Sequence, residues 1–177
     1  MRLIDKTPQV DRRSFLATTG AAALVVTSSA VMCPTESWGY EAKNLKPETV
    51  RTLIKMSRDI YPHDRLADKF YAVAVKGMDG KATDGAPLKT TLEEGVAKLD
   101  AAAKAAYGVS YADVGWEHQR VKLLRAMESD PFFQAVRGDL VVSLYNQKEL
   151  WPIFGYEGES ASKGGYIKRG FNDIDWL

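Results

Sequence analysis

Apolar residues recur three and four positions apart through residues 47–146, and no convincing run of alternating strand residues interrupts them. This spacing places the apolar side chains on one face of an α-helix. The first such segment begins at Pro47, which suits a first helical turn because no backbone N–H is needed there, and it stops before Pro62. Its predicted buried stripe consists of Val50, Leu53, Ile54, Ser57, Ile60 and Tyr61.

Four more helices are predicted after Pro62. The second begins where Asp64 can cap it, the third covers about 87–107 and ends at Gly108, the fourth covers about 116–128, and the fifth opens at Asp130-Pro131. Trp116 is expected to anchor the fourth helix by packing back on the others. The side chains predicted to face inward are Leu66, Phe70, Val73, Ala74, Met78, Leu92, Val96, Leu99, Ala102, Ala106, Val121, Leu124, Met127, Phe133, Val136, Leu140, Val141 and Leu144. Together the five segments predict an all-α fold, a compact bundle over residues 47–146.

Few residues of this chain could hold a cofactor or a metal ion. Its 177 residues include one cysteine, Cys33, and two histidines, His63 and His118. One cysteine excludes an intramolecular disulfide, a Cys-rich zinc site, a thiolate-held iron–sulfur cluster and covalent haem c. The pairs Glu93-Glu94 and Glu117-His118 lack the Glu-x-x-His spacing of bundle metal sites, so they predict a solvated helix face. We therefore expect no bound cofactor or metal, and the net charge of +1 argues against a nucleic-acid partner.

The N-terminal segment predicts export from the bacterial cytoplasm. Arg12 and Arg13 precede Phe15 and Leu16, and a moderately apolar stretch then runs to Met32. This order is similar to the twin-arginine signal, which directs proteins that cross the membrane already folded. The small residues at the end of this segment favour cleavage after residue 30. Residues 1–30 are therefore predicted to be a signal peptide, and residues 31–46 a polar linker. The expected location is the periplasm.

Two alternatives compete for the same segment. Residues 15–32 are just long enough to span a membrane, although their Gly, Thr and Ser content lowers the hydrophobicity. Cys33 could instead accept a lipid, but Met32 is too large for the position before a lipoprotein cysteine. We expect Cys33 to be an inert thiol.

The segment Tyr-Pro-His-Asp at residues 61–64 is the most suggestive internal motif. A loop histidine beside an aspartate could transfer protons. A structural interpretation competes with this one: the proline ends a helix, a loop follows, and the aspartate caps the next helix. It explains every residue of the motif except His63. His63 and Asp64 are therefore polar loop residues with no assigned role, and catalysis by His63 is the less favoured interpretation.

The last part of the chain, residues 147–177, differs from the rest. Glycines recur through it and break any helix, yet it is rich in aromatic residues, unlike a disordered tail. It is predicted to be an extended, ordered segment that either wraps its own bundle or anchors a partner, because Trp and Tyr dominate interface hot spots. The candidate partner-interface residues are Trp151, Tyr156, Tyr166, Phe171 and Trp176.

Three motifs carry a resemblance to a known family. They are YPHD.LAD..Y at residues 61–71, W..FGYEGES at 151–160 and GGYIKRGFNDIDWL at 164–177. With the twin-arginine leader, they resemble the gluconate 2-dehydrogenase subunit 3 family, the small subunits of bacterial membrane-associated sugar and polyol dehydrogenases. Residues 80–130 contribute little to the likeness. The family supplies no catalytic residue that maps onto this chain.

The resemblance implies a partner that carries FAD, a flavoprotein of the glucose–methanol–choline oxidoreductase type. Such complexes often add a c-type cytochrome, and the small subunit is thought to lend its export signal to the flavoprotein and to support its folding. The chain is accordingly expected to be a non-catalytic subunit, associated with the membrane only through the complex or the signal segment. An independent periplasmic binding or scaffold protein, or an enzyme that uses His63, remains the alternative.

Overall fold

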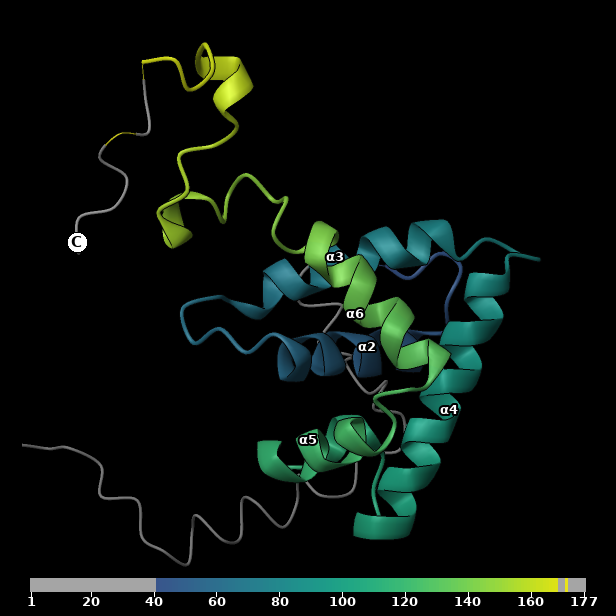
Figure 1. Ribbon diagram of the computed structural model, residues 1–177. Helices are drawn as coiled ribbons and strands as arrows, with labels where there is room; N and C mark the ends of the chain where they lie inside the picture. The colour runs from purple at the N-terminus through teal and green to yellow at the C-terminus, as the bar shows by residue number, and fades with distance from the viewer. Residues whose placement is uncertain (1–40, 169–170, 172–177) are drawn as a thin grey trace, which may run out of the picture. The chain divides into compact units, whose positions relative to one another are not determined.

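The computed structural model describes residues 41–168 and 171, all within one unit of the chain, Cys33–Leu177. Five α-helices and no strand occur in this part: α2 (Pro47–Ile60), α3 (Asp68–Lys81), α4 (Pro87–Tyr107), α5 (Glu117–Ala126) and α6 (Pro131–Ser143). Three short 3₁₀ turns accompany them: η2 (Tyr111–Asp113), η3 (Pro152–Phe154) and η4 (Ser160–Lys163). The predicted all-α bundle is therefore confirmed (Figure 1).

Local chemistry explains where several of these helices begin and end. α2, α4 and α6 each have proline in the first turn, where a missing N–H breaks no helical hydrogen bond. Asp130 caps α6 by accepting a hydrogen bond from the Phe132 amide at 2.9 Å, which lowers the pKa of Asp130. α4 ends at Gly108, whose φ of 77° lies in the left-handed region.

The core is built around α2, which contacts each of the other four helices. Figure 1 shows α2 lying between α5 and the pair formed by α3 and α6. Thr49, Thr52 and Met56 are buried together with most of the predicted stripe, so α2 is covered on more than one face. The largest fully buried side chains of the described core are Tyr71, Tyr111, Phe132, Leu53, Met56, Met78, Leu92, Leu99, Leu140, Leu144, Leu150 and Val50.

Two buried or half-buried carboxylates hold the chain that leads into α2. Asp79 on α3 accepts hydrogen bonds from the amides of Lys43, Asn44 and Leu45 at 2.8–3.0 Å. Glu93 on α4 accepts from the Lys46 amide and from the Thr49 hydroxyl. Residues 43–46 are thus fixed to the bundle, although the sequence placed them in a linker, and Glu93 ties two helices together rather than lying on a solvated face.

Two expectations about the starts of helices were also wrong. α3 begins at Asp68 rather than near Asp64, its N-cap is Ala67, and Asp64 is an exposed loop residue. Leu66 accounts for the difference, because it is buried and its carbonyl accepts a hydrogen bond from Arg58 at 2.9 Å, which holds the loop in place. Trp116 is 70% exposed instead of packing on the bundle.

Further errors concern side chains at the edge of a predicted stripe. Val73 and Val141 are 53% and 52% exposed. Ala102 and Ala106 are also exposed, and Ala103 is buried in their place. Neighbouring positions on a helix are about 100° apart, so Val73 and Ala74, or Leu140 and Val141, cannot both point to the centre of one narrow interface.

Candidate functional site

An aromatic cluster joins the loop after α2 to the end of α6. It consists of Tyr61, His63, Tyr145 and Phe154. The His63 Nε2 atom lies 2.7 Å from the Tyr145 hydroxyl, a hydrogen bond between residues 82 positions apart. The His63 and Phe154 ring centroids are 5.1 Å apart, and those of Tyr61 and Tyr145 are 5.7 Å apart with the rings edge to face. Burial raises the pKa of the Tyr145 phenol, with a smaller contribution from Tyr61.

The predicted His63–Asp64 pair is not brought together. The described partner of His63 is a tyrosine hydroxyl, whereas Asp64 is exposed and has no hydrogen bond or ion pair to a described residue. His63 is therefore packed against Tyr145 and does not form the predicted pair with Asp64. His63 thus acquires a structural explanation that the sequence did not provide.

The first part of the tail packs on its own bundle. Leu150 is fully buried, and the Trp151 indole N–H donates to the Tyr145 carbonyl at 3.1 Å. The Tyr156 ring meets the Trp151 ring edge to face at 5.3 Å between centroids. Gly158 has a φ of 97°, and a Cβ at this position would lie 3.2 Å from the Trp151 ring. The positive φ therefore favours glycine at this position, and an added Cβ would also press against the Trp151 ring.

After Trp151 the tail exposes several large apolar side chains. Tyr156 is 50% exposed, Tyr166 66%, Ile167 85% and Phe171 82%. In Figure 1 this yellow part of the chain extends away from the five helices. The structure thus separates the predicted interface residues: Trp151 belongs to the bundle, whereas Tyr156, Tyr166 and Phe171 are available to a partner. Trp176 lies outside the described residues.

A buried ionic network connects α2, η2 and α5. Arg120 donates to both carboxylate oxygens of Asp59, from Nε at 2.7 Å and from Nη2 at 2.8 Å. The Tyr111 hydroxyl donates to the same carboxylate at 2.7 Å, and Arg120 Nη1 reaches the carbonyls of Val114 and Gly115. Burial and the adjacent Asp59 charge raise the pKa of Tyr111, and the hydrogen bonds to Asp59 raise the pKa of Arg120. These bonds hold α2, η2 and α5 together, and the sequence analysis did not identify the residues that make them.

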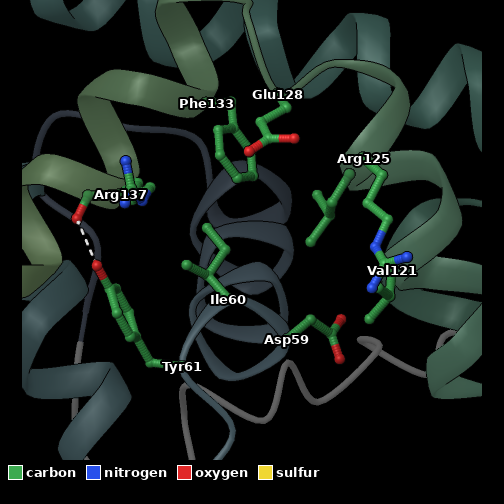
Figure 2. Close-up of a pocket in the computed structure, with 9 residues that line it drawn as sticks. Asp59, Ile60, Tyr61, Val121, Arg125, Glu128, Phe133 and Arg137 are labelled. Atoms are coloured by element: carbon green, nitrogen blue, oxygen red, sulfur yellow. Dashed lines mark hydrogen bonds between the residues drawn. The ribbon is translucent and has the colours of Figure 1, made fainter.

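A groove of about 400 Å³ opens beside this network, between the end of α2 and the facing sides of α5 and α6. We name it the α2–α5–α6 groove. Its lining residues are Asp59, Ile60, Tyr61, Val121, Leu124, Arg125, Glu128, Phe133 and Arg137. Figure 2 shows Ile60 at the centre, with Arg125 and Arg137 on opposite sides. The Tyr61 hydroxyl donates to the Arg137 carbonyl at 3.4 Å and joins α2 to α6 at one wall.

The export residues Arg12, Arg13, Phe15 and Leu16 lie outside the described part of the chain. Within residues 41–168 no helix is long and apolar enough to cross a bilayer. The same residues contain no cluster of three or more His, Cys, Asp or Glu side chains arranged to hold a metal ion. No protein-family model matches the chain, and neither a curated protein nor a solved structure gives a match.

Proposed function

We propose that this chain is a non-catalytic small subunit of a periplasmic FAD-dependent sugar or sugar-acid dehydrogenase. The observation that carries the proposal is the tail beyond Trp151, where Tyr156, Tyr166 and Phe171 are exposed although large aromatic side chains usually become buried. Exposed aromatics on an otherwise packed protein are suited to anchoring a partner, because rigid rings contribute much contact area for little lost entropy. The expected partner is a flavoprotein of the glucose–methanol–choline type, which holds the FAD, the substrate pocket and the hydride transfer.

The twin-arginine pair gives the proposal its second element. FAD is inserted where it is made, in the cytoplasm, so a loaded flavoprotein has to cross the membrane folded. If the flavoprotein lacks a signal, a small subunit bound to it can supply one. Arg12 and Arg13 would then direct the export of the whole complex to the periplasm.

The paired arginines offer the direct test. Changing Arg12→Lys together with Arg13→Lys keeps the charge but removes the guanidinium geometry, and the two residue types are not equivalent in specific recognition. We expect both this chain and its proposed flavoprotein partner to remain in the cytoplasm, as measured by cell fractionation and FAD-dependent dehydrogenase activity. Lys43→Arg, a substitution in the described chain, is the control and should leave export unchanged. A flavoprotein that still reaches the periplasm would refute the shared signal.

We expect substitutions in the tail to weaken binding to the flavoprotein without lowering the folding stability of this chain. Replacing Tyr156, Tyr166 and Phe171 together by serine should weaken association with the flavoprotein by about thirtyfold or more, since truncating one buried aromatic anchor typically costs about 2 kcal/mol. Helicity and the urea midpoint should change little, because these rings are at least half exposed.

Trp151→Ala is the matched comparison for the tail. Trp151 is half-buried and hydrogen-bonded to Tyr145, so its loss should lower the urea midpoint. Co-purification and circular dichroism would be read on the same samples. Undiminished association of the triple serine variant would move the partner interface to the helical faces.

A further inference from the structure

The α2–α5–α6 groove combines an apolar floor with two cationic walls. Ile60 and Phe133, which lie between the two arginines in Figure 2, form what we call the floor, and Val121 and Leu124 extend the apolar lining. Neither the Arg125 nor the Arg137 guanidinium has a hydrogen bond, an ion pair or a ring contact with any described residue. Arg51, Arg58 and Arg120 bind carboxylates, whereas the exposed Arg65, which lies outside the groove, also has no hydrogen bond or ion pair with a described residue. Two arginines with no charged partner among the described residues therefore line the same groove as these apolar side chains.

The carboxylates of the groove do not neutralise these arginines. Asp59 lies in the lining, but both of its oxygens are occupied by Arg120 and Tyr111. Glu128 is the remaining lining carboxylate, and it has no ion pair with Arg125 or Arg137. The free charges of the lining are thus two arginines and one glutamate, which favours an anionic occupant.

The groove is also held open by bonds that do not depend on an occupant. The Asp59–Arg120 pair fixes α5 to α2, and the hydrogen bond from Tyr61 to the Arg137 carbonyl fixes α6 to α2 (Figure 2). Helices that are already fixed in place lose little backbone freedom on binding, which lowers the entropic cost of association.

We propose that the α2–α5–α6 groove is a docking site for an acidic peptide segment of a partner polypeptide. An apolar side chain of the segment packs on Ile60 and Phe133, and carboxylates beside it pair with Arg125 and Arg137. Guanidinium and carboxylate groups match in shape and form two parallel hydrogen bonds. A small anion without an apolar group could make these bonds but would leave the apolar floor uncovered. The proposal is independent of the export role, since it concerns binding by this chain alone.

The test uses two labelled probe peptides and the full chain. One peptide is Gly-Asp-Trp-Asp-Gly and the other is Gly-Lys-Trp-Lys-Gly, each with a fluorescent label and blocked ends, and binding is followed by fluorescence anisotropy. The acidic peptide should bind saturably to the unchanged chain. The variant Arg125→Glu with Arg137→Glu should bind it at least about thirtyfold more weakly, because two charge-assisted contacts are lost. The same variant should gain affinity for the lysine peptide.

Arg65→Glu with Lys104→Glu provides a control with the same change in net charge. Both residues are exposed and neither lines the groove. This control should bind the acidic peptide as the unchanged chain does. Equal weakening in both variants would indicate non-specific attraction and overturn the proposal, as would absence of saturable binding. Light scattering that shows a dimer lost in the Arg125→Glu, Arg137→Glu variant would assign the groove to a second copy of this chain and also overturn it.

Discussion

Asp59→Ala should lower the free energy of unfolding by about 3–5 kcal/mol, the cost of leaving one member of a buried ion pair without its partner. Asp59 and Arg120 are 8% and 6% exposed, so the Arg120 guanidinium would be left largely buried without its carboxylate. The Tyr111 hydroxyl would lose its acceptor at the same time. Urea unfolding of the full chain, followed by circular dichroism, measures the difference.

Two comparisons separate this effect from a general sensitivity to lost ion pairs. Asp68→Ala removes the partner of Arg58 in a pair whose Asp68 side chain is 51% exposed, and it should cost about 1 kcal/mol or less. Asp59→Leu combined with Arg120→Leu removes both buried charges and should be less destabilising than Asp59→Ala. Equal costs for Asp59→Ala and Asp68→Ala would show that the buried network contributes no more than a surface pair.

The positions of the helices could be predicted because their determinants are local. Pro47, Pro87 and Pro131 mark three helix starts, and Gly108 marks the end of α4 where the sequence placed it. The start of α3 could not be predicted in this way. Asp64 is a residue type that caps helices, but the loop continues beyond it because Leu66 is buried and its carbonyl binds Arg58.

The candidate sites also differ in whether local sequence or long-range contacts determine them. Aromatic and glycine content alone indicated that the tail was unusual. Contacts with Tyr145 show that Trp151 and Phe154 pack on the bundle, whereas Tyr166 and Phe171 are exposed. Asp59 and Arg120 are 61 positions apart, and nothing in the sequence near either residue indicates that they meet. The α2–α5–α6 groove depends on the same meeting of helices, so it could be found only in three dimensions.

Gly95→Ala should destabilise the fold by about 2 kcal/mol or more, although alanine is the better helix former. Gly95 is buried within α4, and a Cβ built on it would collide with the ring of Phe132 on α6. Phe132 is 1% exposed, and the clash involves its Cβ and Cγ atoms, so either the helices must separate or the whole ring must move. Urea unfolding of the full chain is again the measurement.

Gly77→Ala is the matched control for Gly95→Ala, because Gly77 lies inside α3 and a Cβ there would meet nothing within 4 Å. It should stabilise the protein by about 0.5–1 kcal/mol through helix propensity alone. Combining Gly95→Ala with Phe132→Leu should then cost less than the sum of the two single changes, since the smaller side chain leaves room for the added methyl group. Additive costs would mean that Gly95 does not set the approach of α4 to α6, and a gain from Gly95→Ala equal to that from Gly77→Ala would mean that the two helices pack more loosely than the Phe132 contact requires.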